Sequence, residues 1–158
     1  MPWLVPIDSL SILFCEDVRE EMGGKASLLG VFGSKISLPE FPALIQKLCI
    51  VFMADVRDTP SFPIVVTMQS PEGIALPPRM EHTIADNDNP DWNFRVIAAL
   101  NGLSIPGPST IAVEFVAGSE VISRTLRFEL GSPAVSQSEI VDRGQMVPGG
   151  AFGPGEAD

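Results

Sequence analysis

A pair of glycines, Gly23 and Gly24, lies between two apolar runs and constrains the fold more than any other feature of this sequence. Both residues can adopt a positive φ at no steric cost, as the central positions of a tight hairpin turn require. The first apolar run begins at Ile12 and the second ends at Phe32. The sequence therefore predicts a β-hairpin over residues 12–32, around which an all-β chain is organised.

A two-residue turn at the glycines also predicts the pairing across this hairpin. It places Val18 opposite Leu29 and Cys15 opposite Phe32. Both faces of the hairpin are partly apolar, so the pattern leaves open which of them faces the core.

Two acidic residues, Glu16 and Asp17, interrupt the first apolar run. One hypothesis is an acidic spot that binds a partner protein. The other is an ion pair between Asp17 and Arg19, which share a face and would fix the register without any chemistry. Exposed pairs of this kind contribute roughly 0–1 kcal/mol. The ion pair is favoured, and Glu16 and Asp17 remain candidate partner-binding residues.

Here a resemblance appears. Residues 15–19 read Cys-Glu-Asp-Val-Arg and residues 23–31 read Gly-Gly-Lys-Ala-Ser-Leu-Leu-Gly-Val. This pattern resembles the opening of a family of small, functionally uncharacterised bacterial and phage proteins. Residues 106–108, Pro-Gly-Pro, with the strands expected around 111–115 and 121–130, are similar to that family's closing hairpin. The resemblance covers most of residues 10–130. It implies a β-sandwich, and it supplies no activity and no catalytic residues.

Short apolar stretches separated by turn residues continue along the chain to Leu130. The near-continuous apolar run over 47–56 indicates a central strand covered on both faces. A short helical turn is expected over 40–46, and no long amphipathic helix interrupts the strands. This spacing is typical of a sandwich. We therefore expect an all-β, immunoglobulin-like or C2-like antiparallel β-sandwich of about seven to nine strands.

The composition changes at Gly131. From there to Asp158 the chain is punctuated by Gly, Pro and Ser, with too little apolar surface to offset the entropy of ordering. We expect residues 1–130 to form the sandwich domain and residues 131–158 a flexible C-terminal tail. Phe152, in the glycine-rich end of this tail, is a candidate partner-binding residue if the tail orders on a partner.

Charge excludes several classes of partner. The net charge of −10 argues against sequence-independent nucleic-acid binding and against docking on anionic membranes. The first residues lack a basic leader region, and no apolar run approaches the roughly 20 residues that cross a bilayer. We expect a cytoplasmic protein, or one in a phage particle assembled there. Its two cysteines, Cys15 and Cys49, lie in apolar stretches and are expected to be reduced and buried. The alternative, a disulfide between them, requires that their two strands be neighbours.

The inventory of chemical groups is poor for catalysis. The chain has one histidine, His82, and no tyrosine, and it lacks a Gly-x-Ser-x-Gly elbow, a phosphate loop and a Cys-x-x-Cys motif. A pairing of His82 with Cys15 or Cys49 is disfavoured, because an apolar strand raises the pKa of a thiol. An enzyme is therefore the least favoured class.

One loop carries oxygen ligands of the kind that Ca²⁺ prefers. Asp86, Asp88 and Asp91 alternate there with asparagines. Pro90 occupies the fifth position, so this is no EF-hand, and Asp and Asn are also common in ordinary turns. We expect a non-catalytic binding or structural module without a cofactor, acting through a protein partner or self-association. The alternative is a calcium-dependent module that uses this loop.

Overall fold

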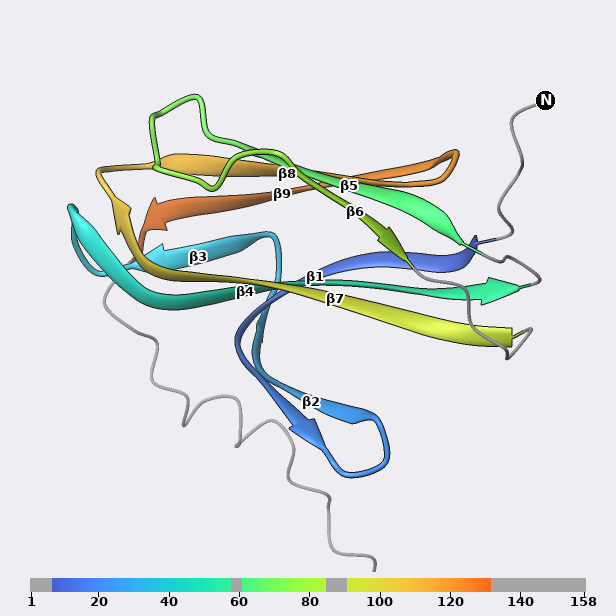
Figure 1. The fold of residues 1–158 in the computed structure, drawn as a ribbon. Helices are drawn as coiled ribbons and strands as arrows, with labels where there is room; N and C mark the ends of the chain where they lie inside the picture. The colour runs from blue at the N-terminus through green and yellow to red at the C-terminus, as the bar shows by residue number, and fades with distance from the viewer. Residues whose placement is uncertain (1–6, 58–60, 85–90, 132–158) are drawn as a thin grey trace, which may run out of the picture.

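The structure, a computed structural model, describes the backbone of residues 7–57, 61–84 and 91–131, and their side chains except at 7–9, 57, 91 and 92. This part of the chain forms nine strands and no helix (Figure 1). The strands are β1 (Ile7–Glu21), β2 (Lys25–Phe32), β3 (Lys35–Leu38), β4 (Ala43–Arg57), β5 (Phe62–Gln69), β6 (Met80–Ile84), β7 (Asp91–Ile105), β8 (Ser109–Ala117) and β9 (Glu120–Leu130). The predicted tail, apart from Gly131, lies outside the described residues.

The strands form two sheets that pack face to face as a sandwich (Figure 1). One sheet has the order β2-β1-β4-β7, and the other has the order β3-β9-β8-β5-β6. In an immunoglobulin domain strands B and E pair in one sheet, while C, F and G lie in the other. Here β4 and β7 correspond to strands B and E, and β5, β8 and β9 correspond to strands C, F and G. The predicted β-sandwich is confirmed, with an immunoglobulin-like strand order.

One pair of strands departs from the predicted antiparallel arrangement. β3 runs parallel to β9, with Ile36 opposite Phe128. Parallel neighbours need a long connection, which a short hairpin turn cannot provide, and most of the chain separates these two strands. An ion pair between Lys35 Nζ and Glu129 Oε1, 2.6 Å apart, joins them at the surface.

The short helical turn expected over 40–46 is wrong. Residues from Ala43 onward already belong to β4, where Ala43 is paired with Ile105 and Ile45 with Leu103 of β7. This ladder satisfies the backbone groups that a helical turn would have to satisfy locally.

Phenylalanines fill the space between the sheets. Phe52 of β4 stacks on Phe115 of β8 with 4.8 Å between ring centroids, which joins the centres of the two sheets. Each fully buried phenylalanine stabilises the fold by about 1.5–3 kcal/mol, and a ring pair adds about 0.5–1.5 kcal/mol. The fully buried phenylalanines are Phe14, Phe52, Phe62, Phe115 and Phe128.

β4 is covered on both faces, as its apolar run predicts. Ile50 and Phe52 belong to the core between the sheets. Cys49 and Val51 point to the opposite face and are nevertheless only 1% and 0% exposed. With Cys15 they form a second, smaller apolar cluster on the outside of the four-stranded sheet.

β1 changes its pairing partner along its length. It pairs with β4 from Ile7 to Cys15 and with β2 from Phe14 to Glu21. Beyond Cys15 the hairpin therefore leaves the four-stranded sheet, on the side away from the five-stranded sheet (Figure 1). We call this two-stranded extension, residues 16–31, the arm.

The hairpin exists as predicted, but its predicted register is wrong by one residue. Val18 lies opposite Leu28, and Cys15 lies opposite Val31. The cause is the turn, which spans three residues, 22–24, between the paired residues Glu21 and Lys25. Gly23 and Gly24 still have positive φ values, 83° and 74°.

We predict that Gly24→Val destabilises the arm by about 1–2 kcal/mol, the cost of a left-handed conformation in a residue with a side chain. No atom lies within 4 Å of a Cβ placed there, so backbone strain alone is tested. Amide hydrogen exchange should become faster over residues 16–31. The matched control is Gly33→Val, where φ is not in the left-handed region and space is equally open. Equal exchange in the two variants would contradict the turn described here.

Candidate functional site

The predicted partner-binding residues Glu16 and Asp17 lie at the root of the arm, directly after Cys15. Glu16 is exposed and Asp17 is half-buried. The third, Phe152, lies outside the described residues. The predicted calcium ligands Asp86 and Asp88 also lie outside them, and of Asp91 the structure describes the backbone alone, at the start of β7. Within the described ranges, no three His, Cys, Asp or Glu side chains come together to hold a metal.

Asp17 has two cationic neighbours. Its carboxylate accepts a hydrogen bond from Lys47 Nζ of β4, and Arg19 Nε lies 3.8 Å from its Oδ2. The predicted pair with Arg19 is therefore confirmed as a loose contact, and Lys47 is the closer partner. Sequence reasoning missed Lys47 because 30 residues separate it from Asp17. The register of β1 with β4 explains why the two residues meet. Cys15 lies opposite Cys49, and in this antiparallel pair the residues two positions beyond them are Asp17 and Lys47.

This contact between the arm and β4 shifts the pKa values of Asp17 and Lys47 in opposite directions. The hydrogen bond from Lys47 lowers the pKa of Asp17, and the same hydrogen bond raises the pKa of Lys47. A depressed carboxyl pKa stabilises the fold at neutral pH, and this contribution is lost as the pH falls below the ordinary value of 3.8. The contribution of Lys47 is lost only as the pH rises above 10.5.

Glu16 lies against the other strand of the arm. Gly30 of β2 has a φ of 61°, and a Cβ built on it would lie 2.6 Å from the Glu16 Cδ atom. The Glu16 side chain thus crosses Gly30 at a point where any larger residue would collide with it. Glu16 is exposed at the bend where the arm begins.

Two free thiols lie beneath the arm. Cys15 and Cys49 are direct partners in the β1–β4 ladder, and both are buried. Burial is the largest cause that raises the pKa of Cys15, followed by the neighbouring Cys49. The partly buried side chains that pack around this cluster are Leu13, Val18, Leu28, Met53 and Ile97. Val18 and Leu28 come from the arm itself.

The tip of the arm touches the sheet again at one point. Arg95 Nη2 of β7 donates a hydrogen bond to the carbonyl oxygen of Gly24, 3.2 Å away. A hollow of about 330 Å³ lies between the tip and the outer face of the sheet, with Ser11, Asp55 and Asn93 among its polar lining residues. Met22 at the tip remains 95% exposed.

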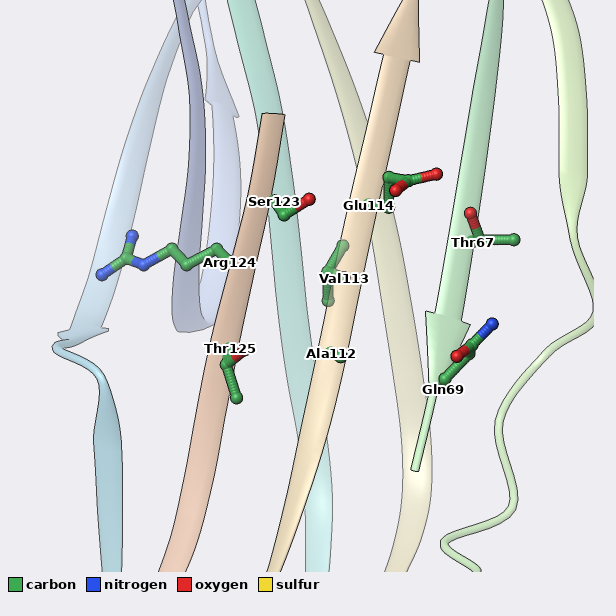
Figure 2. Close-up of a pocket in the computed structure, with 8 residues that line it drawn as sticks. All are labelled: Thr67, Gln69, Ala112, Val113, Glu114, Ser123, Arg124 and Thr125. Carbon is green, nitrogen blue, oxygen red and sulfur yellow. The ribbon is translucent and has the colours of Figure 1, made fainter. Parts of the chain in front are cut away.

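A second hollow, of about 160 Å³, lies on the five-stranded sheet (Figure 2). Its uncharged polar groups and its carboxylate come from three strands: Thr67 and Gln69 of β5, Glu114 of β8, and Ser123 and Thr125 of β9. The Arg124 side chain extends away from these groups (Figure 2). Its Cζ atom lies 5.1 Å from the centroid of the Phe14 ring, and its Nη1 donates a hydrogen bond to the carbonyl oxygen of Ile12.

One charged residue that sequence reasoning missed has a structural role. Glu72 lies within the turn after β5, and its carboxylate accepts a hydrogen bond from the Thr110 backbone nitrogen of β8, 3.1 Å away. This bond is the largest cause that lowers the pKa of Glu72. Glu72 therefore fastens the loop between β5 and β6 to the neighbouring strand.

The fold and this arm define an immunoglobulin-like β-sandwich whose first hairpin folds out of its sheet. Residues 10–128 match the model of a family of unknown function, DUF6941, and the chain belongs to that family. No curated protein matches the sequence. In the part of the chain that the structure describes, no helix is long and apolar enough to cross a membrane.

We predict that the Asp17 carboxyl titrates below 3.8, the ordinary value, when followed by NMR. In Lys47→Gln the midpoint should rise toward that value, because the donor of the main hydrogen bond is gone. Lys25→Gln removes a charge from the same arm at a position paired with Glu21 and should leave the midpoint unchanged. An ordinary midpoint in the unmodified protein would contradict the contact between Asp17 and Lys47.

Proposed function

We propose that this protein is a non-catalytic binding or structural module that acts through protein–protein contacts, with the arm as its contact surface. The observation that carries the proposal is the exposure of large apolar side chains on the arm. Met22 at the tip is 95% exposed, and Val31 on β2 is 54% exposed. An unbranched methionine adapts to irregular partner surfaces, which suits a contact residue.

The edge of β2 gives the arm a second means of contact. Among the described strands, β2 pairs with β1 on one side and has no neighbour on the other. An open strand edge presents backbone donors and acceptors to which an extended segment of a partner can add. Glu16 and Asp17 supply negative charge at the root of the same arm, and they would favour a basic partner there.

The chemistry of the described residues supports a role without catalysis. The two thiols are buried, and burial raises the pKa of Cys15, which opposes a role as nucleophile. His82 is exposed on β6, the edge strand at the far side of the other sheet. These side chains therefore form no nucleophile–base pair.

We further propose that the protein acts in the cytoplasm, or within a bacterial or phage assembly formed there. Its net charge of −10 favours protein partners over nucleic acids and anionic membranes. Self-association through the arm is one form that such an assembly can take.

The test is site-specific photo-crosslinking in the cell of origin. A photoreactive phenylalanine analogue at position 22 or 31 should give discrete, larger adducts, because both side chains are exposed. The matched control is position 125, an exposed threonine on the outer face of the five-stranded sheet. Adducts equal in yield at all three positions would exclude the arm as the contact surface. No adduct at any position would contradict a binding role.

A further inference from the structure

We propose that Cys15 and Cys49 are a reversible oxidation site, at which a small disulfide such as oxidised glutathione converts the two thiols into a disulfide between β1 and β4. Nothing in this inference depends on the binding role proposed above. It concerns the root of the arm, where β1 parts from β4.

The register of the two strands provides the geometry. Cys15 and Cys49 are direct partners in an antiparallel ladder. Such partners have Cα atoms about 4.5–5.5 Å apart. A disulfide spans Cα separations of about 4.4–6.8 Å, so partners in such a ladder lie within its range. Both side chains also lie in the same cluster on the same face of the sheet, beside Val51.

The position of this pair gives the bond a consequence. Cys15–Cys49 is the last paired rung of β1 with β4. Beyond it, the exposed ion pair between Asp17 and Lys47 links the diverging strands. A covalent bond at the last rung would fasten the base of the arm and oppose its separation from β4.

The arm also controls access to the thiols. Cys15 and Cys49 are 0% and 1% exposed, and the arm contributes Val18 and Leu28 to the apolar side chains that pack around them. Burial raises the pKa of Cys15, so little thiolate is present at neutral pH while the arm is in place. We therefore infer that oxidation proceeds through local opening of the arm, as expected for a two-stranded ribbon with few supporting contacts.

The reaction is a pair of thiol–disulfide exchanges. One cysteine thiolate attacks a sulfur of the small disulfide, which releases one small thiolate and leaves a mixed disulfide on the protein. The second cysteine thiolate then attacks the protein-bound sulfur and displaces the other small thiolate. The two cysteines are oxidised, the reagent is reduced to two thiols, and these take up the two protons that the cysteines lose.

The test is incubation of the full chain with excess oxidised glutathione at pH 8, followed by intact mass and peptide mapping. We expect a monomer lighter by two hydrogens, with a Cys15–Cys49 link that dithiothreitol removes. Cys15→Ser and Cys49→Ser should each stop at a single glutathione adduct. A wild-type product that carries one or two glutathiones without an internal link, or a disulfide-linked dimer, would overturn the proposal. So would the absence of any reaction.

A second measurement tests control by the arm. Leu28→Ala should speed formation of the internal disulfide about tenfold, because truncating an arm contact shifts the local opening equilibrium. The matched control, Leu44→Ala, makes the same truncation at a 67% exposed position of β4 and should leave the rate unchanged. An unchanged rate in Leu28→Ala would show that the arm does not gate the thiols. If that variant fails to fold, low urea on the wild-type protein supplies the same comparison.

Discussion

β4 is apolar on both of its faces, and the rest of the structure follows from the need to cover both. Its inner face packs against the five-stranded sheet, where Phe52 stacks on Phe115. Its outer face carries Cys49 and Val51, which would meet water in an ordinary two-layer sandwich. The chain covers this face by letting β1 leave the sheet after Cys15 and fold back with β2 as the arm.

This arrangement places one element in two roles. The inward side of the arm, through Val18 and Leu28, closes a small apolar cluster. Elsewhere the arm exposes the side chains of Met22 and Val31, and among the described strands β2 has an open edge. Contacts of the first kind are few, so the arm is held to the sandwich more weakly than the sandwich strands are held to one another.

Much of the fold could be predicted from the sequence, and the parts that could not are those set by long-range geometry. Local turn chemistry at Gly23 and Gly24 predicts the hairpin, and the run over 47–56 predicts a strand covered on both faces. The register fails by one residue because Met22 joins the turn, which no local pattern indicates. The parallel entry of β3 beside β9 also depends on topology, since the two strands are far apart in the sequence.

The candidate site shows the same division. The acidic residues Glu16 and Asp17 stand out in the sequence, and they do lie together at the root of the arm. The partner of Asp17, Lys47, becomes evident only once β1 and β4 are known to be neighbours. The same pairing of strands places Cys15 opposite Cys49, and the sequence alone does not show that these two strands are neighbours.

The most direct test of this account is a methyl-resolved nuclear Overhauser spectrum of the folded protein. If the arm covers the outer face of β4, methyl groups of Val18 and Leu28 should show cross-peaks to Val51 or to the β-protons of Cys49. Absence of these cross-peaks, with arm amides exchanging at the rates of an unfolded chain, would contradict the central claim that the arm closes the second apolar cluster.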